Sequence, residues 1–199
     1  MSGGRAFNIN KHHGIVFVPF GQNCVMKTIV LLFLLFPVFA FAQTKWQPVT
    51  YNVSFKIKNA GVIVSGKFTG LKTDLKFSPD KLNTSHLKGT VEVPTIKTGI
   101  GKRDEDLKNE KYFNAKKYNL IEVASTKLYK KDAQYAGMFN VTIKGVTKQV
   151  EIPFEYIQNG KEAEFKGTFI INRRDYGVGG KTLTMSEDAD VTIYIKAKS

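Results

Sequence analysis

Most of the sequence from residue 51 to residue 197 alternates apolar and polar residues one by one. This period is typical of strands that bury one side and expose the other. Turn-forming pairs such as Lys144-Gly145 and Asn159-Gly160 separate several of the alternating segments, and short turns join antiparallel neighbours. The pattern predicts an all-β fold of about eight antiparallel strands, in the segments 51–57, 71–77, 91–93, 121–123, 135–143, 150–156, 165–171 and 191–197.

Eight one-sided antiparallel strands can form either a closed barrel or a two-sheet sandwich. A barrel has no exposed edge, and eight strands enclose room for one small ligand. Phenylalanine is frequent on the side that we expect to face inward, so the rings either fill a packed core or line a cavity, and alternation alone does not decide between the two. The phenylalanines expected inside are Phe55, Phe68, Phe77, Phe139, Phe154, Phe165 and Phe169.

The alternation stops at residues 95–113, where a glycine-punctuated loop precedes a short charged segment. Asp104 to Asp106 are all acidic, and Lys108 follows them, which is the charge order that a helix dipole favours. Leu107, Tyr112 and Phe113 are its few apolar residues. We therefore predict one short helix that covers an opening of the strand structure, with residues 103–113 as a gate.

The N-terminal residues have the pattern of an export signal. Met26 and Lys27 precede an apolar run, 29–41, which ends in Ala40-Phe41-Ala42, a small-x-small cleavage pattern. The run is shorter than the roughly 20 residues of a spanning helix. We predict a probable upstream extension at 1–25, a signal peptide at 26–42, and an exported, periplasmic domain at 43–199. The single cysteine, Cys24, would be lost with the signal.

The chain is basic, with a formal net charge of +13. Removing residues 1–42 would remove Arg5, Lys11 and Lys27 and no acidic residue, which leaves +10. Scattered lysines on the outer side of strands favour a solvated surface that discourages edge pairing. The sequence lacks the arginine-rich motifs of nucleic-acid binding, so we expect no nucleic-acid partner. Contact with an anionic membrane surface is a weaker alternative, and the oligomeric state is left open.

Few residues in the sequence suggest catalysis or metal binding. His86 would be the one histidine of the exported domain, and no cysteine accompanies it. The pattern therefore offers neither a nucleophile–histidine pair nor a zinc cluster. We expect no catalytic residue, no metal and no cofactor other than a bound lipid, and we expect His86 to be a surface residue.

Four segments together resemble the YceI-like family of exported lipid-binding proteins. They are VSFKIKN to VSGKF (53–68), TG to RD, LK and YF (98–113), IKGVTK (143–148) and INRRDYGV (171–178). They follow one another in the family's order over nearly all of residues 43–199. The family commonly has histidine where this chain has Asp106, so no role of that histidine is carried over.

The resemblance implies a lipocalin-like barrel with a short helical segment, whose interior holds a long apolar chain such as a polyisoprenoid or an isoprenoid quinone. It implies a non-catalytic carrier or sequestering protein of the bacterial envelope; the alternative is a solid-core structural or stress-response protein that acts through its surface. Arg103 and Arg173 are expected either to contact the lipid head group or lid, or to form structural pairs with Asp104 or Asp175. The implied cavity lining is Phe55, Ile57, Phe68, Phe77, Leu107, Phe113, Phe139, Val141, Phe154, Phe165 and Phe169.

Overall fold

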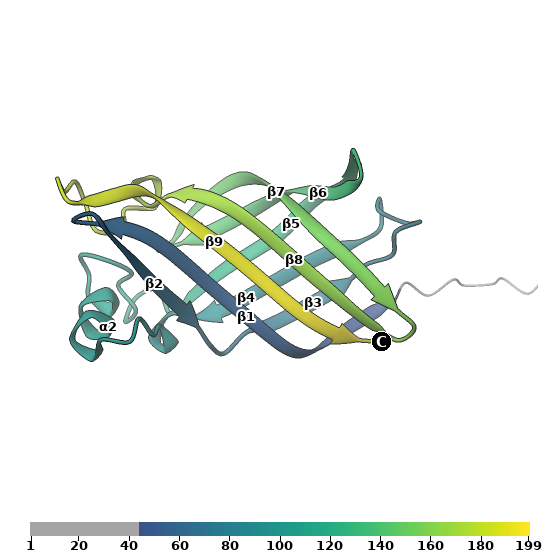
Figure 1. Ribbon diagram of the computed structural model, residues 1–199, viewed down its shortest axis with the longest axis horizontal. Helices are drawn as coiled ribbons and strands as arrows, with labels where there is room; N and C mark the ends of the chain where they lie inside the picture. Colours follow the sequence, from purple (N-terminus) through teal and green to yellow (C-terminus); the bar gives the residue numbers. More distant parts are fainter. Residues whose placement is uncertain (1–43) are drawn as a thin grey trace, which may run out of the picture. The chain divides into compact units, whose positions relative to one another are not determined.

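A computed structural model describes residues 44–199; the predicted upstream extension (1–25), the signal peptide (26–42) and Cys24 lie outside the described residues. The described part contains nine strands, one α-helix and two 3₁₀ helices (Figure 1). The elements are β1 (Lys45–Asn59), β2 (Val62–Phe68), β3 (Lys72–Lys76), β4 (His86–Glu92), η2 (Val93–Thr95), α2 (Gly101–Lys108), β5 (Leu120–Lys131), β6 (Gln134–Ile143), β7 (Val146–Asn159), β8 (Glu162–Asn172), η3 (Arg173–Tyr176) and β9 (Met185–Lys198).

The strands form a closed antiparallel barrel. Neighbours from β3 to β9 pair in sequence order, and β9 returns to pair with β1 along almost its whole length. The ring closes because the start of β1 also pairs with β3, through Lys45 and Trp46. Eight strands complete this ring, which confirms the predicted eight-stranded barrel and rules out the sandwich. The ninth strand, β2, pairs with the second half of β1, where β1 no longer pairs with β3.

Local residues explain where β4 ends and how β6 turns into β7. β4 begins earlier than the predicted segment 91–93 and ends at Glu92, because Val93 and Pro94 start a 3₁₀ helix. The turn between β6 and β7 has left-handed backbone at Lys144 and Gly145, with φ of 52° and 77°. A Cβ at Gly145 would lie 2.6 Å from the Tyr118 ring, so this turn requires glycine.

One end of the barrel interior is filled by six aromatic rings, which we call the aromatic plug: Trp46, Phe77, Tyr135, Phe154, Tyr156 and Phe165. The Phe77 ring is fully buried, and its centroid lies 4.6 Å from that of Tyr156 and 5.4 Å from that of Tyr135. The Trp46 Nε1–H donates to the Phe77 carbonyl oxygen at 3.0 Å. Burial raises the pKa of Tyr156 to about 12. This end is therefore a solid core.

The helix α2 lies at the other end of the barrel, away from the C-terminus of the chain (Figure 1). It confirms the predicted short helix. Leu107 and Phe113 pack against a small second cluster of buried residues that includes Phe68, and the Phe68 and Phe113 ring centroids lie 6.0 Å apart. The helix is thus attached to the barrel through few apolar side chains.

Candidate functional site

A cavity of about 310 Å³ occupies the barrel interior between the aromatic plug and the α2 end. Its walls come from all nine strands and are overwhelmingly apolar. Twelve of the thirteen side chains that the sequence analysis singled out line it: Phe55, Ile57, Phe68, Leu107, Phe113, Phe139, Val141, Phe154, Phe165, Phe169, Arg103 and Arg173.

Phe77 is the exception, because it does not line the cavity. Its ring lies inside the aromatic plug, where Phe154 and Phe165 contact it at centroid distances of 5.7 Å each. Those two rings also line the cavity and so form its floor. Phe77 supports the floor from behind, which is a packing role.

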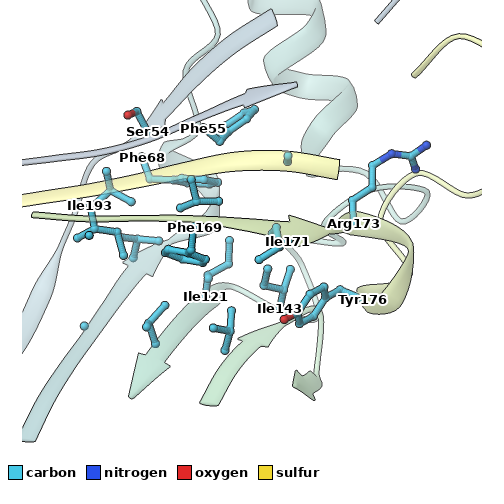
Figure 2. Close-up of a pocket in the computed structure, with 18 of the residues that line it drawn as sticks. Ser54, Phe55, Phe68, Ile121, Ile143, Phe169, Ile171, Arg173, Tyr176 and Ile193 are labelled. Atoms are coloured by element: carbon cyan, nitrogen blue, oxygen red, sulfur yellow. The ribbon is translucent and has the colours of Figure 1, made fainter. Parts of the chain in front are cut away.

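Several lining residues were absent from the predicted set. Ile121, Ile143, Ile171 and Ile193 line the cavity beside Phe169 (Figure 2). Each lies on the inward-facing side of the alternation in its own strand, so the alternation could have identified them. Tyr176 also lines the cavity from η3, a short 3₁₀ turn that has no periodic signal.

The start of α2 is held by Thr98. Asp104 is buried, and one of its carboxylate oxygens accepts from the Thr98 backbone N–H at 2.7 Å and from the Thr98 hydroxyl at 2.6 Å. The hydrogen bond from the Thr98 side chain lowers the pKa of Asp104. Arg103 donates to the Thr98 hydroxyl at 2.8 Å and to the Thr98 carbonyl at 2.9 Å. Thr98 therefore connects the two charged residues, whereas the structural alternative for Arg103 was a direct pair with Asp104.

Arg173 holds the loop between β8 and β9. It is 4% exposed, and its guanidinium donates to the carbonyls of Val178 and Gly180 at 2.7 Å and of Ser186 at 2.8 Å. It also donates to the Met185 carbonyl at 3.3 Å and to the Thr182 hydroxyl at 3.5 Å. These five bonds match the five N–H donors of arginine. Arg173 thus fastens the glycine-rich loop, as in the structural alternative, but its acceptors are four carbonyls and the Thr182 hydroxyl and not Asp175.

Among residues 44–199, no group of three or more His, Cys, Asp and Glu side chains could hold a metal ion. His86 is a half-buried residue at the start of β4 whose Nε2 lies 2.8 Å from an Asp74 carboxylate oxygen. Within the same residues, no helix is long and apolar enough to cross a membrane.

Residues 45–197, nearly the whole described barrel, match the YceI-like domain. The chain belongs to the YceI-like family. Among curated relatives, it is 25% identical over 151 residues to a UPF0312 protein of Photorhabdus laumondii, covering 72% of this chain and 79% of that protein. It is 28% identical over 140 residues to a UPF0312 protein of Pseudomonas fluorescens, covering 63% and 70%.

Several solved structures have the same fold as this chain. BcnA of Burkholderia cenocepacia superimposes with a TM-score of 0.72 at 24% identity, covering 74% of this chain and 96% of BcnA. A Campylobacter jejuni YceI protein gives 0.62 at 26% identity, covering 68% and 85%. A polyisoprenoid-binding domain of Saccharophagus degradans gives 0.58 at 13% identity, covering 78% and 97%.

Proposed function

We propose that this YceI-like protein binds an apolar lipid with a long chain inside the barrel and carries or sequesters it in the bacterial envelope. The observation that supports this best is the apolar cavity, which has an aromatic floor at one end and, at the other, a polar helix with few apolar contacts to the barrel. The Saccharophagus degradans neighbour is a polyisoprenoid-binding domain by name, which supports an isoprenoid chain as the ligand. An isoprenoid quinone fits the same proposal.

Hydrophobic burial would supply most of the affinity. Removing apolar surface from water is favourable by about 25 cal/mol of free energy per Å². The cavity volume of about 310 Å³ lies at the lower end of the range of roughly 300–1,000 Å³ for small-ligand pockets. The interior therefore suits part of a long chain, and the rest would extend through the α2 end.

We propose that residues 103–113 act as the gate of the cavity. Leu107 and Phe113 line it, and α2 has few other apolar side chains to hold it against the barrel. Elements with few buried apolar contacts open at low free-energy cost. Arg103 lines the same end, and its Nη1 makes no hydrogen bond to the described residues, so it can contact a lipid head group.

The α2 end also suits contact with an anionic membrane surface. Ile100 precedes α2, and the tip of the β1–β2 hairpin carries Val62; both are exposed, and Leu183 is fully exposed in the β8–β9 loop. The hairpin and the loop are joined by a hydrogen bond from the Ala60 N–H to the Thr184 carbonyl. Exposed lysines of the same segments are Lys58, Lys102, Lys111 and Lys181.

Vesicle binding tests this membrane contact. Val62→Ser with Leu183→Ser should reduce co-sedimentation with phosphatidylglycerol vesicles several-fold, because both apolar side chains would leave the membrane interface. Ile157→Ser is the matched control, since Ile157 is exposed near the opposite end of the barrel, on β7. Equal loss in both variants would contradict membrane contact at the α2 end.

The proposal includes export to the periplasm, because the sequence predicts a signal peptide at residues 26–42. It does not include catalysis. The alternative function, a solid-core envelope protein that acts through its surface, would leave the interior without a role. The six rings of the aromatic plug are consistent with such a core at one end only.

A cavity-filling variant tests the proposed function. Ala189 lines the cavity, and its neighbour across the pair with β8 is Ile171. In delipidated protein, Ala189→Phe should abolish binding of decylubiquinone, measured by quenching of Trp46, the only tryptophan of the chain. Ile170→Phe adds a ring to the exposed outer face at the same height and should bind as wild type does. Equal binding by both variants would contradict an interior site.

A further inference from the structure

A buried hydroxyl without a hydrogen-bond partner lies on the cavity wall. Among the described residues, two buried side-chain oxygens lack a hydrogen-bond partner: those of Thr73 and Tyr176. Only Tyr176 lines the cavity, and it is 2% exposed. Leaving such a group unpaired costs about 1–3 kcal/mol, so natural structures nearly always pair buried polar atoms.

The Tyr176 hydroxyl faces apolar surroundings. In Figure 2 its oxygen lies toward Ile143, while the Arg173 guanidinium points away from the apolar side chains. The five donors of Arg173 are already used by the β8–β9 loop, so this arginine cannot neutralise a ligand charge without releasing the loop. A charged group beside Tyr176 would therefore be buried without a counter-ion, which is very costly.

Resting on the proposed function, we propose that Tyr176 is a specificity-determining residue that donates a hydrogen bond to a neutral carbonyl oxygen of the bound lipid. The ligand class is then an apolar chain with a ketone, quinone or ester oxygen, and neither a pure hydrocarbon nor an anionic head satisfies this position. Burial raises the pKa of the Tyr176 hydroxyl, with a smaller contribution from Asp175, which keeps the donor proton in place. Any phosphate would have to lie beside Arg103, whose Nη1 makes no hydrogen bond to the described residues.

Two isoprenoid probes of similar length separate this role from simple packing: farnesylacetone, which carries a ketone, and farnesene, a hydrocarbon. Tyr176→Phe should weaken farnesylacetone binding about five- to tenfold in calorimetric titrations, the loss of one hydrogen bond. Farnesene binding should stay within about twofold of wild type. Delipidated Tyr176→Phe protein should melt no lower than wild type, since the variant removes an unpaired buried hydroxyl.

Tyr194→Phe is the matched control, because Tyr194 lies on β9 next to the cavity-lining Ile193 but does not itself line the cavity. It should bind both probes as wild type does. Equal affinity of Tyr176→Phe and wild type for farnesylacetone would overturn the inference, and so would an equal loss for both probes, which would indicate a packing role. Failure of wild-type protein to bind either probe would instead overturn the proposed function, and the inference with it.

Discussion

We expect the same substitution, phenylalanine to leucine, to have opposite effects on stability and ligand binding at the two ends of the barrel interior. Phe77 is fully buried in the aromatic plug and pairs with four rings, those of Tyr135, Phe154, Tyr156 and Phe165. Phe169 lines the cavity. A side chain packed on all sides should contribute more to stability than one that borders open space.

The magnitudes follow from these surroundings. Each aromatic pair contributes about 0.5–1.5 kcal/mol beyond area burial, and truncating a core phenylalanine to alanine costs about 3–5 kcal/mol. For Phe77→Leu we expect a loss of about 2–3 kcal/mol in the free energy of unfolding and unchanged ligand affinity. For Phe169→Leu we expect a loss of about 1 kcal/mol or less. Its ligand contact should shrink by roughly 40 Å², which at about 25 cal/mol per Å² weakens binding roughly fivefold.

Guanidinium unfolding of delipidated protein measures the first quantity, and titration with decylubiquinone measures the second. Both variants should keep the wild-type denaturant slope, so that a shifted midpoint reports stability alone. If the two variants lost equal stability and bound ligand as wild type does, the interior would be one uniform core, and the division into plug and cavity would be refuted.

Three further predictions concern the α2 end. Because the pKa of Asp104 is lowered, its stabilising contribution is complete above the ordinary aspartate pKa of about 3.9 and is lost as the pH falls through the folded value. The variant Asp104→Asn should therefore lose less stability than wild type as the pH falls below about 4. An equal loss of unfolding free energy with falling pH in the variant and in wild type would contradict this. Arg173→Lys offers three donors for five acceptors and should lower the free energy of unfolding, measured with denaturant, by about 2–4 kcal/mol. The control is Arg174→Lys, because Arg174 is exposed and pairs with Glu187, and it should lower the free energy of unfolding by less than about 1 kcal/mol. Equal losses in the two variants would refute the role of Arg173. Amide exchange of residues 103–113 should be faster than that of the flanking strands and should slow when lipid binds, while unchanged exchange would indicate a fixed plug.

The barrel was predictable from the sequence because the two-residue period of a strand determines which side chains face inward. Phe55, Phe139 and Phe169 therefore fall inside as expected. The same period carries no information on depth along the barrel axis, so it could not separate Phe77 in the plug from Phe169 on the cavity. Depth depends on the tilt and register of strands that pair far apart in the sequence.

The polar contacts were less predictable. A charge pattern suggested carboxylate partners for Arg173, but its partners are mainly carbonyls of a loop whose conformation has no periodic signal. The strand β2 escaped the alternation because Gly66 occupies an inward position, where a Cβ would lie 2.3 Å from the Phe55 ring. Tyr176 was missed because a side chain on a short 3₁₀ turn is positioned by the loop around it.

The most direct test of lipid binding is the composition of the native protein. Protein purified from the envelope fraction without detergent should show, by native mass spectrometry, a species heavier than the polypeptide by one lipid. Organic extraction should release that molecule, and mass spectrometry of the extract should identify an isoprenoid chain with a carbonyl oxygen. A polypeptide that carries no lipid, and that takes none up from envelope lipid extract after delipidation, would contradict the account.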